Sequence, residues 1–168
     1  MHTPAEFIDP SFIMFGKLIL AMLLGVVIGT ERAVIAKQAA GTRTFGLVAL
    51  AACLFVLISS YVNTAYLGIS SAAPLQLVAG VVTGIGFIGA GLIIFRGDTV
   101  HGVTTAAGLW IVTAIGIAVG FGMYTVALFA TLLTLIMFTG MWYLENRFKQ
   151  WFEEHGSPPT QSQSLPRL

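Results

Sequence analysis

FIMFGKLILAMLLGVVIGT, residues 12–30, carries a single charged side chain, Lys17, in an otherwise uncharged and mostly apolar run. A hydrocarbon core of about 30 Å is crossed by roughly 17–25 helical residues, so the length of this run predicts a transmembrane helix. The whole chain has the same character, because 57% of its 168 residues are hydrophobic and 9% are charged. A soluble domain has roughly 25% charged residues. The sequence therefore predicts an integral membrane protein.

Four more apolar runs follow, at residues 45–62, 74–95, 103–120 and 123–144. With the first run they predict an all-α fold of about five transmembrane helices, and residues 1–144 form the predicted transmembrane domain. Residues 145–168 are expected to be a short cytoplasmic tail, disordered after about residue 155, because Gly, Ser, Pro and Gln dominate there. A lone cysteine, Cys53, excludes an intramolecular disulfide and a CxxC redox pair.

Basic residues lie mainly on one side of this predicted topology. The first loop, the third loop and the tail contain Arg32, Lys37, Arg43, Arg96, Arg147, Lys149 and Arg167. The other side has Glu6, Asp9 and loops that are short or uncharged. The positive-inside rule therefore predicts an N-terminus outside the cell and a C-terminus in the cytoplasm.

Lys17 is the exception to this distribution, because it lies inside the first predicted helix. Its long stem can carry the ammonium group to the membrane interface, where it would act as an anchor. The other interpretation is a buried ion-pair partner or a residue on an ion pathway. The sequence leaves both interpretations open.

Glycines recur at four-residue spacing in three predicted helices, as Gly25 and Gly29, Gly80 and Gly84, and Gly116 and Gly120. Small residues at this spacing let helix axes approach closely, so we expect helix packing there and at Gly86 and Gly89. Self-association as a homodimer is expected through Gly84 and Gly116. The fifth helix has almost no glycine and is expected to face lipid.

Residues 84–89 also fit GxGxxG, but no strand precedes them, so a nucleotide site is rejected.

Charged and hydroxyl side chains collect at the predicted cytoplasmic ends of the helices. The group comprises Glu31, Arg32, Arg43, Thr44, Arg96, Asp98, Thr104 and Thr105. One interpretation is topology anchoring, with Thr hydroxyls capping helix N-termini. The other is a network that recognises a partner or an ion. In such a network Glu31 would pair with Arg43 or Arg32. Asp98 would pair with Arg96.

Sequence patterns of several common catalytic sites are missing, since the chain contains no GxxxxGK[ST], HExxH or GxSxG motif. His2, His101 and His155 are scattered over both sides of the predicted topology and do not predict a shared metal site. We therefore expect neither an enzyme nor a resident cofactor. A net charge of +1 provides no basic field for nucleic acid.

Two long signatures resemble the MgtC/SapB family of bacterial inner-membrane proteins. The first comprises LLGVVIGTER at residues 23–32 and AGTRTFGLV at residues 40–48. The second comprises GIGFIGAGLIIFR at residues 84–96 and GVTTAAGLW at residues 102–110. The chain departs from the family pattern at Thr30, Thr42 and Val103, and His101 stands where a basic residue is common.

This resemblance implies a bacterial inner-membrane protein linked to magnesium limitation, virulence or acid adaptation. It also implies a regulator that contacts other membrane proteins, including the F-type ATP synthase. Many members carry a soluble C-terminal ACT-like domain, for which this chain lacks the length, so a short form is expected. The alternative function is a Mg²⁺ channel or carrier. Its candidate ligands would be Glu31 and Asp98, because Mg²⁺ takes oxygen ligands and the predicted helices contain no Asp or Glu.

Overall fold

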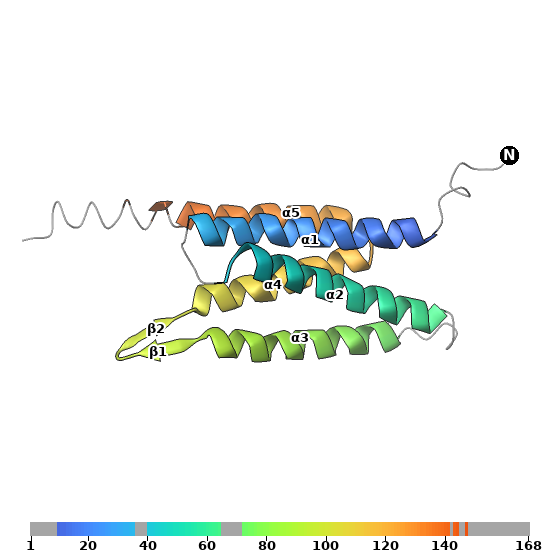
Figure 1. Ribbon diagram of the computed structural model, residues 1–168, viewed down its shortest axis with the longest axis horizontal. Coiled ribbons are helices and arrows are strands. Elements are labelled where there is room, and N and C mark those ends of the chain that lie inside the picture. The colour runs from blue at the N-terminus through green and yellow to red at the C-terminus, as the bar shows by residue number, and fades with distance from the viewer. Residues whose placement is uncertain (1–9, 36–39, 65–71, 142, 145–146, 148–168) are drawn as a thin grey trace, which may run out of the picture.

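The computed structural model describes residues 10–35, 40–64, 72–141, 143–144 and 147 (Figure 1). Its elements in chain order are α1 (Pro10–Val34), α2 (Thr42–Val62), α3 (Ala72–Leu92), β1 (Ile94–Arg96), β2 (Thr99–His101), α4 (Val103–Gly120), α5 (Tyr124–Leu135) and the π-helical turn η3 (Ile136–Gly140). The predictions about Glu6, Asp9 and Lys37, and the prediction of a disordered tail after residue 155, lie outside the described residues.

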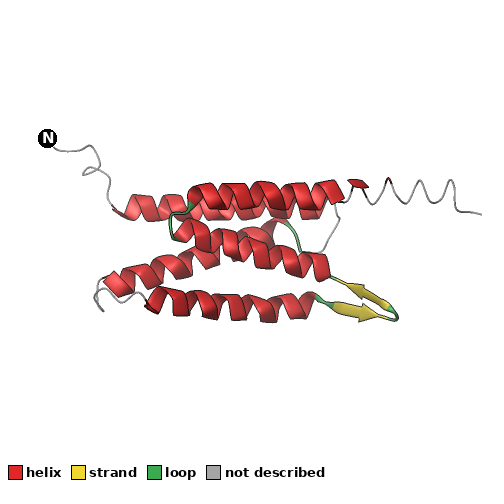
Figure 2. Cartoon of the chain, turned by 180° about the vertical axis from the view of Figure 1, so that it is seen from behind, coloured by secondary structure: helices red, strands yellow, loops and turns green. Residues whose placement is uncertain are grey.

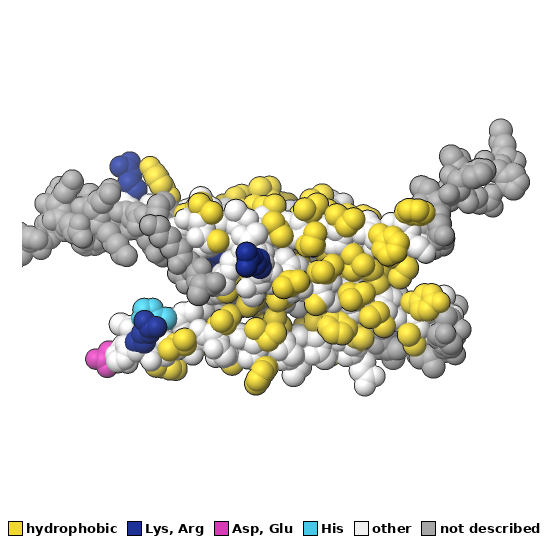
Figure 3. All heavy atoms as spheres, in the orientation of Figure 1, with side chains coloured by type: hydrophobic (Ala, Val, Ile, Leu, Met, Phe, Trp, Pro, Cys, Tyr) yellow, Lys and Arg dark blue, Asp and Glu magenta, His cyan; other side chains and the backbone are white. Residues whose placement is uncertain are grey.

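Four described helices are long and apolar enough to cross a membrane, and a shorter apolar helix spans Tyr124–Gly140. The four long spans are Ser11–Val34, Thr42–Val62, Leu75–Leu92 and Val103–Gly120. Figure 3 shows hydrophobic side chains along the face of the bundle in view, whereas charged side chains on this face gather toward the end that bears the hairpin. The prediction of an all-α integral membrane protein is confirmed.

The helices lie side by side along the length of the molecule (Figures 1 and 2). Helices α1, α2 and α4 pack against one another, and α5 lies beside α1 and α4. The buried core is built from Ala21, Leu24 and Ile28 of α1, Phe45, Ala49 and Cys53 of α2, and Leu109, Val112 and Ile115 of α4. The bundle thus has a three-helix centre.

Helix α3 is the peripheral helix of the bundle and contacts α4 and α2. Only 6% of its apolar span Leu75–Leu92 is buried, whereas 50% of the span Val103–Gly120 in α4 is buried. The fifth helix, which was expected to face lipid, exposes Leu128, Phe129 and Leu132, and α3 is a further exposed helix that was not expected. Glycine content did not predict the exposure of α3, because Gly80, Gly84 and Gly86 make no close contact with a neighbouring helix.

Close backbone contact holds α1, α2 and α4 together at four glycines. A Cβ atom added at Gly25 would lie 2.6 Å from the Phe45 carbonyl oxygen, and one at Gly29 would lie 2.8 Å from the Gly41 carbonyl oxygen. A Cβ at Gly116 would meet the carbonyl oxygen of Ala49, and a Cβ at Gly120 would lie 2.7 Å from Val56 Cβ. These glycines therefore pack within one chain.

The glycines of α3 behave differently. A Cβ added at Gly80, Gly84 or Gly86 would meet nothing within 4 Å, and one at Gly89 would lie 3.6 Å from Ala106 Cβ. The expected helix packing at Gly80, Gly84 and Gly86 does not occur within this chain. Gly116, which was expected on a dimer face with Gly84, is buried against α2 instead.

A short β-hairpin replaces the end of the third predicted helix. Helix α3 stops at Leu92, and β1 pairs antiparallel with β2 in the register Ile94↔His101, Phe95↔Val100 and Arg96↔Thr99. Gly97 has φ +59° in the two-residue turn. Gly102, at φ +89°, sits against the Leu92 carbonyl oxygen and returns the chain to α4. Both positions suit glycine because a Cβ disfavours positive φ.

The glycine contacts predict that alanine has different effects on the free energy of unfolding at Gly116 and at Gly84. Gly116→Ala should lower the free energy of unfolding by about 1–3 kcal/mol, because its Cβ meets backbone that cannot move aside like a side chain. Gly84→Ala should leave stability unchanged or raise it by up to about 1 kcal/mol, because alanine favours helix and the space is open. Thermal unfolding of both variants in detergent measures this difference. Equal destabilisation would contradict the packing described here.

Candidate functional site

A charged cluster lies where the C-terminal end of α1 meets α4 and η3. Successive helices of the bundle run in opposite directions, so this end also holds the start of α2 and the hairpin (Figure 1). Glu31 and Arg32 belong to the last turns of α1 and are only 7% and 5% exposed. Glu31 lies three residues after the buried Ile28, and Arg32 lies four residues after it. This helical spacing places both side chains on or beside the buried face of α1, which also carries Leu24. We call Glu31, Arg32, Thr105 and Phe138 the inner cluster.

Arg32 links three elements within the inner cluster. Its Nη2 atom donates a hydrogen bond of 3.2 Å to Thr105 Oγ1 of α4. Its guanidinium carbon lies 4.7 Å from the centroid of the Phe138 ring in η3. A cation over an aromatic face is attracted by the negative face of the ring, and the attraction is larger when water is excluded. Arg32 therefore ties α1 to both α4 and the last turn of the bundle.

Phe138 is the member of this cluster that the sequence did not reveal. Its ring reaches the cluster through space left by Gly108, where an added Cβ would lie 3.0 Å from the Phe138 and Phe45 rings. The π-helical turn at Ile136–Gly140 changes the register of the last helix, so α-helical spacing does not place Phe138. An aromatic residue near the C-terminal end of the fifth apolar run was the one available signal.

Glu31 has no hydrogen-bond partner among the described residues, although both of its carboxyl oxygens are buried. The Nε atom of Arg32 is also buried without a partner. Consecutive side chains on a helix diverge by about 100°, so these neighbours are poorly placed to bond each other. A buried, unpaired carboxyl group is costly and usually marks a place where water, a proton or a ligand is bound. The inner cluster can therefore bind a donor at Glu31.

The other predicted members of the cytoplasmic network lie apart from this cluster. Arg43 and Thr104 are exposed and Thr44 is half-buried. The expected threonine caps are absent from α2 and α4, whose N-cap residues are Gly41 and Gly102, without a side-chain hydrogen bond. The reason is that both helices begin right after a glycine, and the threonines fall inside their first turns.

Arg96 and Asp98 occupy the exposed hairpin, and no ion pair joins them in the described part of the chain. The structure thus brings together Glu31, Arg32 and Thr105 and separates the hairpin pair from them. Within the described ranges no group of three or more His, Cys, Asp or Glu side chains could hold a metal ion. The two expected Mg²⁺ ligands, Glu31 and Asp98, lie on different elements, one buried and one exposed.

Lys17 performs a structural role at the opposite end of the bundle. Its Nζ atom donates a 2.9 Å hydrogen bond to the carbonyl oxygen of Gly120, the last residue of α4. The last carbonyls of a helix lack partners within the helix, and a cation is favoured there by the helix dipole. Lys17 therefore ties α1 to the turn between α4 and α5.

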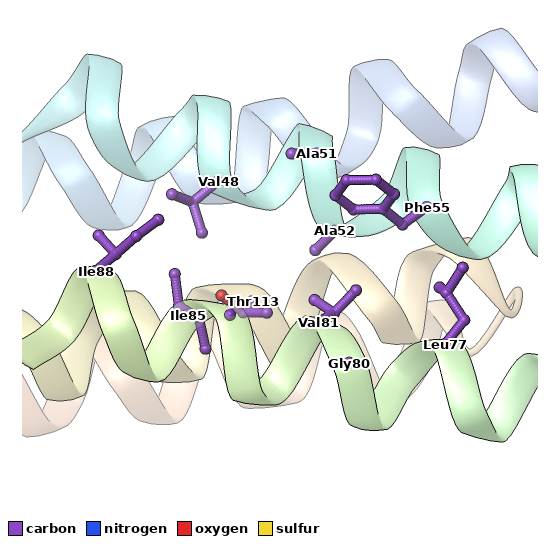
Figure 4. A pocket seen from close by; sticks show the side chains of 11 residues that line it. Val48, Ala51, Ala52, Phe55, Leu77, Gly80, Val81, Ile85, Ile88 and Thr113 are labelled. Atoms are coloured by element: carbon purple, nitrogen blue, oxygen red, sulfur yellow. The ribbon is translucent and has the colours of Figure 1, made fainter.

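An apolar groove of about 520 Å³ runs between α2 and α3 (Figure 4). Its walls include Val48 and Phe55 of α2 and Gly80, Gly84 and Ile88 of α3. The one hydroxyl in its lining, that of Thr113, donates a 2.8 Å hydrogen bond to the Leu109 carbonyl within α4. The groove therefore suits an apolar occupant rather than an ion.

Comparison with known proteins gives relatives over most of the chain. The chain is 39% identical to the putative magnesium transporter YhiD of Escherichia coli K12 over 123 residues, which cover 72% of this chain and 57% of YhiD. It is 42% identical to protein MgtC of Salmonella typhimurium over 119 residues, 71% of this chain and 48% of that protein. It is 39% identical to protein SrpB of Synechococcus elongatus over 134 residues, 74% of this chain and 72% of that protein.

The chain thus spans about half the length of the YhiD and MgtC proteins that it matches. No solved structure matches it. A sequence model of the MgtC family matches residues 18–147, a range that begins within α1 and includes the inner cluster and all the later described helices. With this match and relatives near 40% identity, the chain belongs to the MgtC family.

Proposed function

We propose that this protein is a regulatory protein of the bacterial inner membrane, linked to magnesium limitation and virulence-type adaptation. In this proposal it acts by contact with other membrane proteins, for example the F-type ATP synthase. Its N-terminus would lie outside the cell, and the inner cluster would lie at the cytoplasmic end of the bundle. Four apolar helices and a match to the MgtC family support the membrane location.

The observation that carries this proposal is the closed centre of the bundle. Backbone contacts at Gly25, Gly116 and Gly120 bring α1, α2 and α4 together without an intervening polar path in the described residues. The buried hydroxyls of Thr113 and Thr131 donate to carbonyls of their own helices. Mg²⁺ requires several oxygen ligands and gives up its water reluctantly. A packed apolar centre therefore favours a contact protein over a carrier.

The competing function is a Mg²⁺ channel or carrier, and one observation favours it. Glu31 has two buried oxygens without partners, which is what a cation site at the inner end would need. One relative is named a putative magnesium transporter, although this chain covers only 57% of it. A carrier would have to open the α1–α2–α4 contacts during each transport cycle.

Transport by the purified protein separates the two functions. Liposomes containing the protein and an entrapped Mg²⁺-sensitive dye should show the same slow leak as protein-free liposomes, because the centre of the bundle is closed. A selective Mg²⁺ flux well above that leak, abolished in Glu31→Gln, would reverse the ranking. The matched control is Asp98→Asn, which neutralises a carboxylate on the exposed hairpin.

Contact function through the inner cluster is tested by two substitutions that each preserve positive charge. Arg32→Lys keeps the charge but removes the planar guanidinium that reaches Thr105 and Phe138 together, so low-magnesium growth of a deletion strain should be lost. Arg43→Lys changes an exposed side chain and should support growth like the parent. Membrane abundance of both variants must match the parent. If Arg32→Lys is abundant and fully active, the inner cluster does not carry the activity.

A further inference from the structure

The hairpin carries two opposite charges that have no partner in the described chain. Arg96 ends β1 and Asp98 lies in the turn, and both side chains are exposed. Phe95, the middle residue of β1, is 74% exposed, so the hairpin also presents an apolar ring. A two-stranded hairpin is marginal by itself in water. The hairpin thus presents two opposite charges beside an apolar ring.

The helix that leads into the hairpin has an outward face without a neighbour in the bundle. Gln76, Thr83 and Phe87 lie on that face, since they are spaced by seven and four residues, and all three are exposed. Phe87 is 85% exposed and projects between Gly84 and Gly91, where an added Cβ would meet nothing within 4 Å. Helix α3 thus presents the exposed ring of Phe87, with open space at Gly84 one turn before it and at Gly91 one turn after it.

The apolar groove adjoins this face, because Gly80 and Gly84 line it from α3 while Val48 and Phe55 line it from α2 (Figure 4). A helix that lies against these glycines would also cover the groove. A lipid chain could fill the groove, but it would not engage the hairpin. A membrane helix that continues into a segment with complementary charges would match the groove and the hairpin together.

We propose that this occupant is α3 of a second copy of the chain. Two copies inserted in the same direction can be related by a two-fold axis along the membrane normal, which brings the same surface of each copy into contact. Phe87 of each copy then packs into the glycine hollows of the other. Beyond the membrane the two hairpins adjoin, and Arg96 of each copy faces Asp98 of the other. This arrangement holds whether the protein regulates a partner or carries an ion.

Disulfide crosslinking in native membranes tests the interface. In a Cys53→Ala background, Thr83→Cys on the outward face of α3 should give about tenfold more linked dimer than Phe129→Cys on an exposed face of α5, because a held interface raises the effective concentration of the thiols. The linked species should have the mass of two copies. Equal crosslinking at both positions, or a product of any other mass, would overturn the proposal.

Two further variants in the Thr83→Cys protein test the complementary features. Gly84→Leu fills a hollow that is empty within one chain, so the crosslink should fall to the Phe129→Cys level while abundance is unchanged. Arg96→Glu places like charges opposite each other and should weaken the crosslink, and the swapped pair Arg96→Glu with Asp98→Arg should restore it. Crosslinking that is unaffected by Gly84→Leu and by Arg96→Glu would place the contact elsewhere and sink the proposal.

Discussion

Close backbone contact between α1, α2 and α4 is the interaction on which the rest of the structure depends. Lipid is as apolar as the side chains of a membrane helix, so helices associate through close packing rather than through hydrophobic exclusion from water. Glycine supplies that packing here, because Gly25, Gly29 and Gly116 lie where any side chain would meet backbone or Cβ atoms of α2. Helix α3 lacks such contacts and stays at the edge of the bundle.

This packing also determines where charge can be buried. The close crossing of α1 brings its last turns against α4, so that Arg32 reaches Thr105 and Phe138. A guanidinium in an apolar surrounding needs such partners, and the hydroxyl and the ring supply two of them. Glu31 remains without a partner among the described residues. At the other end, Lys17 closes the turn after α4 through the Gly120 carbonyl. Charge therefore occupies the two ends of the bundle, while the centre is apolar.

The transmembrane helices could be predicted from the sequence because each apolar run has the length of a membrane span, and α4 begins and ends at the predicted residues 103 and 120. The hairpin was missed although Gly97 and Asp98 form a two-residue turn signal, since the apolar run to residue 95 continued through β1. Glycine spacing marked helices that can pack but did not identify their neighbours. Which arginine would be buried was not predicted, because the spacing of Arg32 from Leu24 and Ile28 marks a helix face but does not tell whether that face is buried. Phe138 could not be placed because a π-helical turn shifts its register.

The glycine contacts pack α1 and α4 closely enough for the Arg32 side chain to donate a buried hydrogen bond to Thr105. A double-mutant cycle tests it most directly, with unfolding free energies measured for the parent, Arg32→Gln, Thr105→Val and the double variant. The account predicts a coupling energy of about 1–2 kcal/mol between the two positions, as for a hydrogen bond to a charged group. Additive effects, with a coupling below about 0.5 kcal/mol, would show that the two side chains do not meet and would contradict the account.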